Sequence, residues 1–354
     1  IQLPYCRPSW DPVLDLENSW IWHLVAMDRR IALDLNVYSD VGAEYCHDWD
    51  SVDRFAAAGV NIVHVPRVLC HWRHHERSTS NSDTTNTVSS ASVRHVLSRK
   101  IARRGMTGKA VPAPYPIWRG AEEWWIDRLP VDLPPLISIS GSNLASPSGF
   151  ASITLTDVHD RDELAACVKT LKADAIVALL AHEIVFSDIA GREVVKLLDF
   201  VGDLAVVCGP IIANGKIISA GYSFDSTGRL SAPLDRKDEN YSGPYALGLK
   251  PHCIAAPPSE AFFVRASFLV DALADAPKSV CQAELGLWLG AYAAAHGKRV
   301  AYSPLLRAEA KGDLPSAWDL LSTQLAWQAF CAHTGTAVPS TQSIGGYIPV
   351  RWKP

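Results

Sequence analysis

The sequence has no large excess of either charge. Among its 354 residues, 33 are lysine or arginine and 37 are aspartate or glutamate, which gives a formal net charge of −4 at pH 7. A general nucleic-acid binder needs a basic surface that displaces counterions from the phosphate backbone. This balance therefore argues against nucleic acid as a partner.

Long apolar runs are also absent. The most apolar stretches, residues 174–180 and 204–208, are far shorter than the ~20 residues that a helix needs to span a bilayer. The first residues show no secretory signal pattern. We therefore expect a soluble, cytoplasmic protein.

The chain lacks Cys-x-x-Cys pairs, although it contains 8 cysteines. They stand singly at Cys6, Cys46, Cys70, Cys167, Cys208, Cys253, Cys281 and Cys331. Zinc ribbons need paired cysteines, and small secreted scaffolds need a much higher density of them. We expect reduced thiols, most of them buried.

A glycine-rich phosphate loop is missing as well. Ser140-Gly141-Ser142-Asn143, which ends an expected strand, is too short to qualify as one. An unrelated nucleotide-binding α/β protein is therefore the weakest of the functional hypotheses.

What the sequence does contain is a change of pattern after its first quarter. Residues 78–92 are almost free of apolar side chains, which predicts a loop or linker because such a segment cannot offset its ordering entropy. Residues 93–104 predict a basic helix, and the proline-rich stretches 111–116 and 129–135 predict extended chain. A connector thus separates two regions of different character.

From Leu136 onward, strands and helices alternate, which predicts a parallel, Rossmann-like sheet. The expected strands are residues 136–140, 151–156, 175–180, 204–210 and 300–302, and residues 261–273 are a strand running into a helix. The expected helices are residues 161–171, 189–200, 285–296, which is amphipathic, and 316–332. Asn214-Gly215 predicts a tight turn in a hairpin of residues 209–228.

An internal repeat links the two regions. Each copy has an acidic turn, a helix, a glycine, a short strand and a proline. The first copy runs from a strand and helix near residues 20–30, through a helix at 51–58, to a strand near 59–66; the second covers 262–304. A module that appears twice indicates tandem domains.

Several motifs in the first region stand out: Arg7-Pro8-Ser9-Trp10-Asp11-Pro12 with Asn18 and His23, GAEYCHDWD at residues 42–50, VPRVLCHWR at 65–73, and STS at 78–80. Together they resemble family 2 of the glycosyltransferases, and in particular the tandem-domain type of bacterial O-antigen and surface-polysaccharide biosynthesis. The resemblance covers residues 5–82 well and 136–310 more loosely. It implies an α/β protein of the GT-A (Rossmann-like) glycosyltransferase fold, with a partial first domain and a second domain that is complete but degenerate.

By this resemblance, Asp48 matches the catalytic base, a carboxylate that takes the proton of the acceptor hydroxyl as it attacks the anomeric carbon. An aspartate before a helix is otherwise most often a cap, so both interpretations stay open. Among the implied substrate contacts, Trp10 and Trp49 would stack on sugar faces. Asp50 would also stabilise the start of the helix, because an acidic group there is favoured by the helix dipole. The implied substrate contacts are Trp10, Asp11, Asn18, Trp49, Asp50, Arg73 and Arg77.

His71 matches a histidine that meets the metal or the diphosphate in this family, and Arg73 and Arg77 are placed to meet phosphate oxygens. The resemblance thus implies a divalent metal, Mn²⁺ or Mg²⁺. Half of the 12 histidines fall within residues 23–75, so a structural zinc site is one alternative and solvated loop residues are another.

The second region departs from the family's pattern. Glu183 is the one carboxylate where the family has its metal-binding Asp-x-Asp, Gln282 stands where the base should be, and Ala310 where the later histidine should be. An amide cannot accept the proton of an attacking hydroxyl, so we expect this region to be degenerate, with Glu183 and Glu284 as surface or capping residues. Residues 235–245 form either a plain surface loop or a loop over a sugar site.

These patterns predict four segments. They are residues 1–82, the C-terminal, acceptor-side half of a GT-A domain; 83–135, a linker and connector helix; 136–314, the second, degenerate GT-A-like domain; and 315–354, a C-terminal helix and tail. The donor-binding half of the first domain is expected upstream of Ile1, so the chain is either a fragment or a natural remnant.

The implied function is inverting, metal-assisted transfer of a sugar from a nucleotide-sugar donor to a polysaccharide or lipid-linked glycan acceptor. The alternative is a non-catalytic pseudo-glycosyltransferase module that binds glycan or scaffolds a synthesis complex. The basic helix around residues 94–104 is either a solvated inter-domain helix or a peripheral contact with anionic lipid on the inner face of the plasma membrane.

Overall fold

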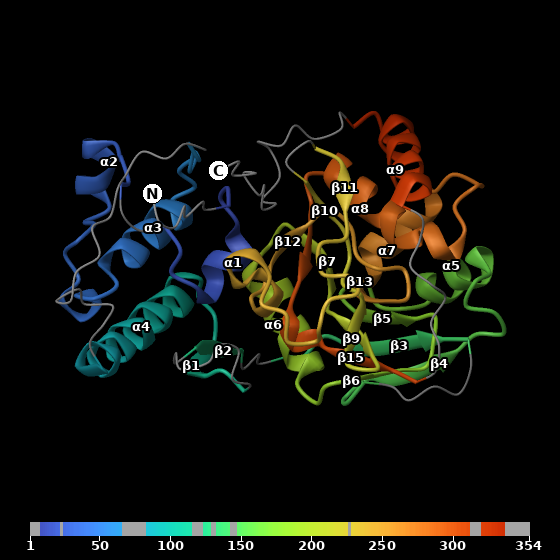
Figure 1. Ribbon diagram of the computed structural model, residues 1–354, viewed down its shortest axis with the longest axis horizontal. Helices are drawn as coiled ribbons and strands as arrows, with labels where there is room; N and C mark the ends of the chain where they lie inside the picture. Colours follow the sequence, from blue (N-terminus) through green and yellow to red (C-terminus); the bar gives the residue numbers. More distant parts are fainter. Residues whose placement is uncertain are drawn as a thin grey trace. The chain divides into compact units, whose positions relative to one another are not determined.

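The computed structural model forms two compact units (Figure 1). It describes residues 8–21, 24–65, 83–114, 123–128, 132–141, 147–225, 228–311 and 320–336. Unit 1 consists of residues 1–10, 14–131 and 352–354, and unit 2 consists of residues 11–13 and 132–351. Each unit has its own buried core, so each is described by itself below.

Unit 1 is mainly helical and carries one two-stranded antiparallel ribbon. Its elements are α1 (Pro12–Glu17, which begins in the stretch assigned to unit 2), α2 (Arg29–Asp34), the 3-10 helix η1 (Val41–Ala43), α3 (His47–Ala57), α4 (Asp83–Arg103), β1 (Gly108–Pro112) and β2 (Trp124–Arg128). Leu16 of α1, Phe55 of α3, and Val96 and Leu97 of α4 are buried in its core. The long helix α4 packs against η1, α3 and β1.

Helix α4 corrects the sequence-based expectation for residues 83–92. The structure has these residues in a helix, so the linker predicted there is wrong, whereas the basic helix predicted at 93–104 is confirmed as the second half of α4. Helix formation is cooperative, and the buried Leu97 and Ile101 stabilise a nucleus from which the polar first half can extend. A serine or threonine adds a penalty of at most ~0.7 kcal/mol per residue relative to alanine.

Two strands expected in unit 1 are not formed. No described residue of the stretch 20–30 is in a strand, and α2 begins only at Arg29. Residues 61–65 are also irregular, with Val63 and Val65 exposed. An isolated strand is not stable in water without a hydrogen-bonded neighbour. Among the described residues, both copies of the repeat form the helix and the left-handed glycine after it, α3 with Gly59 (φ 69°) and α8 (Leu285–Ala295) with Gly297 (φ 63°), but only the second copy forms the strand.

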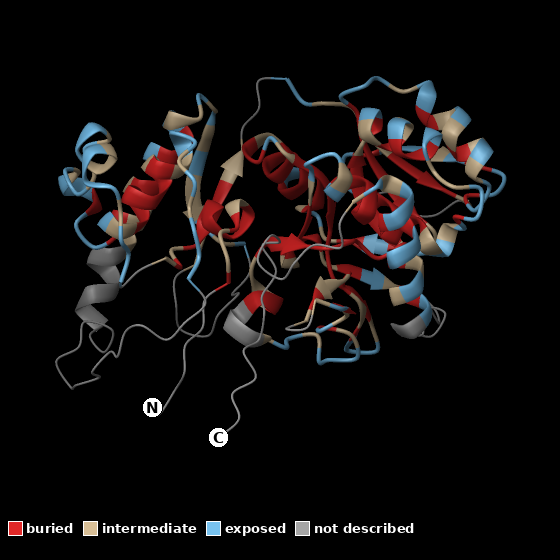
Figure 2. Cartoon of the chain, turned by 90° about the horizontal axis from the view of Figure 1, so that it is seen from above, coloured by how far each residue is buried: buried red, intermediate tan, exposed pale blue. Residues whose placement is uncertain are grey.

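Unit 2 is built on a seven-stranded sheet in the order β12-β14-β7-β13-β5-β3-β4. The strands are β3 (Leu136–Ser140), β4 (Ala151–Thr154), β5 (Ile176–Leu180), β7 (Leu204–Cys208), β12 (His252–Ile254), β13 (Ala261–Arg265) and β14 (Arg299–Tyr302). Every residue of β5 and β7 is buried, and Figure 2 shows how burial is concentrated in the strands and the inner faces of the helices. The strands expected from the alternating pattern are confirmed.

The sheet is mixed, which corrects the all-parallel expectation. Strands β3, β4 and β5 are mutually parallel, but β13 runs antiparallel to both β5 and β7. A parallel crossover needs a connection that carries the chain back across a face of the sheet. The chain between β7 and β13 instead forms short strands, so it re-enters the main sheet in the opposite direction.

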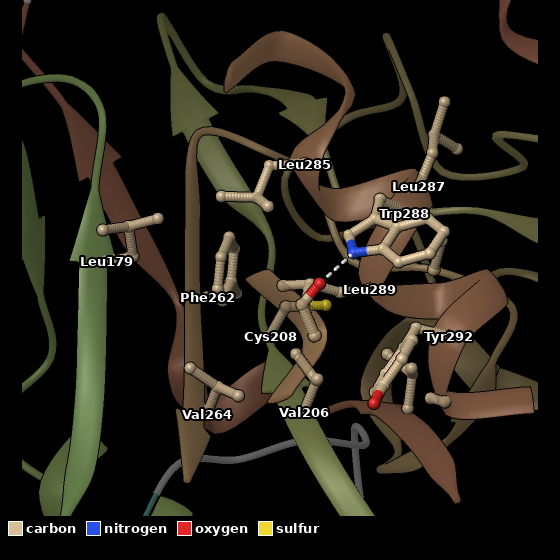
Figure 3. Packing of buried hydrophobic residues seen from close by; sticks show 14 of the residues in the cluster. Leu179, Val206, Cys208, Phe262, Val264, Leu285, Leu287, Trp288, Leu289 and Tyr292 are labelled. Atoms are coloured by element: carbon tan, nitrogen blue, oxygen red, sulfur yellow. Dashed lines mark hydrogen bonds between the residues drawn. The ribbon is translucent and has the colours of Figure 1, made fainter. Parts of the chain in front are cut away.

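The two faces of the main sheet bury different side chains. Phe262 of β13 lies in the cluster that Figure 3 shows, together with residues of α5 (Arg161–Lys169), α7 (Ala266–Ala274), α8 (Leu285–Ala295) and α9 (Leu320–Thr334). Its neighbour Phe263 contacts the rings of Phe150 and Phe186 instead. Helix α6 (Ala190–Phe200) has buried residues that lie outside the first cluster. The alternation of the strand thus places apolar side chains on both faces.

Helix α8 is not amphipathic in its environment, contrary to expectation. All its residues from Leu285 to Ala293 are buried. The contact between α8 and α9 is among the most extensive in the chain, and Trp288 of α8 meets Phe330 of α9 edge to face with ring centroids 5.8 Å apart. Trp288 also donates its indole N–H to the Ala272 carbonyl at 2.8 Å, the dashed line in Figure 3. Because α9 covers the outer side of α8, that side is apolar too.

A second, four-stranded sheet has the order β6-β15-β8-β9. Its strands are β6 (Ile184–Phe186), β8 (Ile211–Ala213), β9 (Lys216–Ser219) and β15 (Ala308–Ala310). Asn214 and Gly215 join β8 to β9 with φ values of 51° and 71°, the left-handed conformation that a two-residue hairpin turn requires. The predicted Asn-Gly turn is confirmed.

The described cysteines are all free thiols. Cys46, Cys208, Cys253 and Cys331 are buried, and burial raises the pKa of the Cys46 thiol to about 12, helped by the charge of Asp48. For these residues, the expectation of reduced, mostly buried cysteines is confirmed. Among the helices of the described stretches, none is both long enough and apolar enough to cross a membrane.

Candidate functional site

The parallel strands of unit 2 end at one edge of the main sheet, called here the carboxyl edge. The chain passes from β3 outward to β4 and then returns to β5 on the other side of β3. In open α/β sheets, ligands bind outside the carboxyl ends of the strands at such a reversal of strand order. The ends of β3 and β5 are therefore the candidate site of unit 2.

Strand β5 is followed at this edge by His182 and Glu183, where the sequence places the metal carboxylate. Burial lowers the pKa of His182, and the nearby His159, which follows β4, lowers it further. Glu183 Oε1 lies 3.0 Å from Nζ of Lys311, and both side chains are about half exposed (46% and 58%). This carboxylate is therefore engaged by a lysine at the surface of unit 2.

The described residues do not fit a resident metal ion. In the stretches that the structure describes, no group of three or more His, Cys, Asp and Glu side chains could hold one. The carboxylate of Glu183 meets a cation of the chain itself.

Two other carboxyl groups, Asp235 and Glu260, come together beside β5. Glu260 precedes β13, and its carbonyl accepts the Ala181 N–H at 2.9 Å, which fixes it next to the end of β5. Burial and then the charge of Glu260 raise the pKa of Asp235 to about 7. Burial also raises the pKa of Glu260. A desolvated acid that titrates near neutrality is a frequent property of functional sites.

Gln282 lies in the 3-10 helix η4 (Gln282–Glu284) and donates its side-chain N–H to the Ser259 carbonyl at 3.4 Å. It is thus tied to the residue next to Glu260. Glu284 accepts the backbone N–H of Cys281 at 3.4 Å, which is the capping role that the sequence left open for it. Ala310 lies in β15. The position of the expected base therefore holds a hydrogen-bonded amide.

The site residues expected in unit 1 occupy α3 and its surroundings. Asp48 lies in the first turn of α3, half-buried, and its Oδ1 accepts the Trp49 N–H at 2.8 Å. Trp49 is buried, donates its indole N–H to the Asp15 carbonyl at 3.1 Å, and lies under the Lys100 ammonium, 4.9 Å from the ring centroid. Its ring is therefore covered by unit 1 and is not exposed to a sugar.

Asp50 belongs to a buried ion-pair network. It contacts Arg103 and accepts the Arg54 Nε–H at 2.7 Å. Asp53, one turn further along α3, contacts Arg103 as well, Arg104 at 3.0 Å and Lys100 at 3.5 Å. Lys100 also donates to Asp15 Oδ2 at 2.7 Å. Asp50 thus links α3 to α4 within unit 1.

The acceptor-side candidates Trp10, Asp11 and Asn18 have different surroundings. Trp10 is partly buried and stacks on Trp20 with centroids 6.3 Å apart. Asp11 is buried and accepts the N–H groups of Val13 at 2.9 Å and of Cys253 at 2.7 Å. Asn18 is buried. Asp11, Val13 and Cys253 all belong to unit 2, so Asp11 ties residues 11–13 to β12 within that unit.

His71, Arg73 and Arg77 lie outside the described residues, as does the motif at residues 66–80 that contains them. Their expected roles at a metal or a diphosphate remain predictions. Asp235 begins the polar loop 235–245 that the sequence left open as a surface loop or a loop over a sugar site. No spacing in the sequence pairs it with Glu260, because the two residues meet only through the fold.

Comparisons with known proteins leave the family open. No protein-family model matches the chain, and no curated protein matches it. A crystal structure of GalNAc-T7 with UDP, GalNAc and Mn²⁺ is similar over 60% of this chain and 49% of that chain, with 9% identity and a TM-score of 0.37. A crystal structure of A197 from STIV is similar over 52% of this chain and 98% of that chain, with 12% identity and a TM-score of 0.29.

The chain thus spans about half the length of the GalNAc-T7 chain, at 49%. At these TM-scores and identities, neither likeness supports an argument about function. What is established for this chain is a mixed α/β unit joined in sequence to a mainly helical one.

Proposed function

We propose that this chain is a glycosyltransferase, or part of one, that uses a nucleotide-sugar donor and a polysaccharide or lipid-linked glycan acceptor. The observation that carries the proposal is the reversal of strand order between β3 and β5, with polar and acidic groups gathered at the carboxyl ends of these strands. Such an edge suits a nucleotide ligand. The resemblance of residues 5–82 and 136–310 to family 2 of the glycosyltransferases supports the same class.

In this proposal, transfer is inverting and Asp48 of unit 1 takes the proton of the acceptor hydroxyl, as the resemblance of residues 5–82 implies; the carboxyl edge of unit 2 is a separate candidate ligand site. Its carboxylate is half-buried in the first turn of α3, and its Oδ1 accepts the Trp49 N–H at 2.8 Å. Trp49 and Asp50 are left out of the substrate contacts, since their side chains are engaged inside unit 1. The metal dependence of the reaction is an outcome of the test below.

A second candidate function is a non-catalytic module that binds glycan or nucleotide sugar without turnover. Gln282 favours it, because an amide that donates to the Ser259 carbonyl cannot serve as a base in unit 2. The ion pair of Glu183 with Lys311 favours it too, because that carboxylate already has a cationic partner. Both functions require a ligand at the carboxyl edge, so binding is tested first.

Isothermal titration of the full chain with uridine and thymidine diphosphate sugars, with and without Mn²⁺, tests the proposal. We expect saturable binding, weakened about tenfold or more, equivalent to about 1.4 kcal/mol, by Lys311→Gln, because this variant removes the cation beside Glu183 that a diphosphate would meet. Lys298→Gln, an exposed lysine that follows α8, is the matched control and should bind as the unaltered chain does. Sugar transfer abolished by Asp48→Asn with binding retained supports the enzyme.

Binding without turnover in the unaltered chain supports the non-catalytic module. No binding of any nucleotide sugar to the folded chain contradicts both. The circular dichroism spectrum of each variant is compared with that of the unaltered chain, so that a loss of binding can be distinguished from a loss of folded structure.

A further inference from the structure

Residues 232–238, called here the Asp235 loop, are fastened to β9. The Arg236 N–H donates to the Ile217 carbonyl at 2.7 Å, and the Ile217 N–H donates to the Lys237 carbonyl at 2.9 Å. Arg236 has a φ of 61°, a left-handed conformation that is unfavourable for a residue with a Cβ. Arg236 and Lys237 are exposed, whereas the carboxyl of Asp235 is turned into the protein. The backbone of the loop thus holds Asp235 inward.

The carboxyl of Asp235 is poorly provided with donors. The Ala220 N–H donates to it, but Oδ1 is buried and has no hydrogen-bond partner among the described residues. The carboxyl of Glu260 accepts its own N–H and that of Ser259. A carboxylate has room for about four hydrogen bonds, so the pair is better suited to one negative charge than to two.

The other groups around the pair do not neutralise it. Tyr222, beyond the end of β9, lies near both acids, and the pKa of its hydroxyl is raised by burial and by their charges. Its hydroxyl bonds to Thr323 of α9. From the loop itself, the exposed Arg236 lowers the pKa of Asp235 less than Glu260 raises it. Two neighbouring carboxyl groups that are buried and lack a strong cationic partner keep a shared proton up to a higher pH than either group would in water.

The pKa of Asp235, at about 7, lies in the range where small changes of pH alter its charge. When its proton leaves to solvent, a second negative charge is added next to Glu260 and beside the unpartnered Oδ1. A buried carboxylate with so few donors is strongly unfavourable. Water must then reach the pair, and the Asp235 loop is the adjoining segment whose residues 236–238 are exposed.

We propose that Asp235 and Glu260 form a proton-dependent latch, which holds the Asp235 loop closed while the pair carries a proton and releases it from β9 when both acids are ionised. The latch lies beside the end of β5, because the Glu260 carbonyl accepts the Ala181 N–H. The latch needs no ligand, so its test does not depend on whether the proposed function is correct. If a nucleotide sugar binds at the carboxyl edge, the latch makes its access dependent on pH.

Hydrogen exchange of the full chain between about pH 6 and about pH 9, corrected for the intrinsic rate, tests the latch. In peptides that cover the loop and β9, we expect protection to fall roughly tenfold per pH unit above the midpoint, because opening is linked to the loss of one proton. Peptides from β7 should keep their protection. Asp235→Asn should remain protected throughout, since an amide does not ionise.

Asp238→Asn is the matched control: it removes an exposed carboxylate of the same loop, 3.7 Å from Lys216 Nζ of β9, so it lowers protection by a similar factor at every pH and removes no group that titrates near neutrality. It should keep the midpoint of the unaltered chain. Glu260→Gln should move the midpoint to lower pH, since it removes the like charge. Protection of the loop that does not change with pH, or a slope that persists in Asp235→Asn, overturns the latch.

A measurement on the unaltered chain keeps the proposal testable if Asp235→Asn does not fold. In a carbon-13 NMR titration, the signal of one side-chain carboxyl should change with a midpoint near neutrality. The amide signals of residues 216–219 should change with the same midpoint. An Asp235 carboxyl that titrates near its ordinary value of 3.8 overturns the latch.

Discussion

At the scale of single residues, Asp53 is fully buried in unit 1 and contacts three cations, Lys100, Arg103 and Arg104. Burial raises its pKa, but these cations outweigh that effect and the net pKa is lowered. Removal of the carboxylate leaves buried cations without their counter-charge. Such an unpaired charge costs about 3–5 kcal/mol.

We therefore expect Asp53→Asn to lower the free energy of unfolding by about 3–5 kcal/mol, measured by urea titration of tryptophan fluorescence. Asp34→Asn on the exposed surface of α2 is the control and should change it by less than about 0.5 kcal/mol. A loss below about 1 kcal/mol in Asp53→Asn would mean that water or other side chains can take over the contacts of the Asp53 carboxylate.

The same residue predicts a dependence on pH. Because the folded pKa of Asp53 lies below the ordinary value of 3.8, its ionisation stabilises unit 1 above that value, and the contribution is lost as the pH falls through the folded pKa. Asp15 has the opposite sign, since burial raises its pKa and outweighs Lys100. In acid titrations followed by fluorescence, Asp53→Asn should lose less stability between pH 5 and pH 2 than the unaltered chain. An equal loss contradicts this assignment.

At the scale of elements, α8 illustrates how closely the helices of unit 2 approach the rest of the chain. A Cβ at Gly290 would lie 2.6 Å from the Cβ of Ala256, well inside contact distance, and would also meet the carbonyl of Ala255. Gly290 is therefore required for the approach of α8 to Ala255 and Ala256.

Gly290→Ala should destabilise unit 2 by about 1–3 kcal/mol through overpacking. Thermal unfolding followed by circular dichroism checks this. Gly202→Ala is the control, because nothing lies within 4 Å of an added Cβ there and its φ is not in the left-handed range. If the two variants have the same midpoint, α8 can move away from Ala255 and Ala256 without cost.

In helix α4, the packing of one half affects the conformation of the other half. The run of Ser, Thr and Asn at residues 83–92 has little helix propensity, and local pattern alone predicts a linker. The second half of the same helix buries Val96, Leu97 and Ile101. Tertiary packing of one half thus decides the conformation of the other, which propensity cannot anticipate.

At the scale of the whole molecule, the division into two compact units predicts two cooperative transitions in calorimetry. Asp53→Asn should lower the midpoint of the transition of unit 1, and Gly290→Ala that of unit 2. A single transition that both variants shift equally would show that the chain unfolds as one block.

The sequence by itself determined much of unit 2. Alternating strands and helices, the Asn214-Gly215 turn and the buried thiols follow from local patterns that repeat within a few residues, and the structure confirms them. Such patterns reflect the period of the backbone and the burial of apolar faces, which neighbouring residues fix between them.

Only the tertiary structure decided the direction of β13, the burial of Trp49 and the meeting of Asp235 with Glu260. Each depends on residues far apart in the chain: β13 on the strands beside it, Trp49 on Lys100, and Asp235 on an acid 25 positions away. The charge state of a carboxyl is set by what surrounds it in space, and a linear pattern carries no such information.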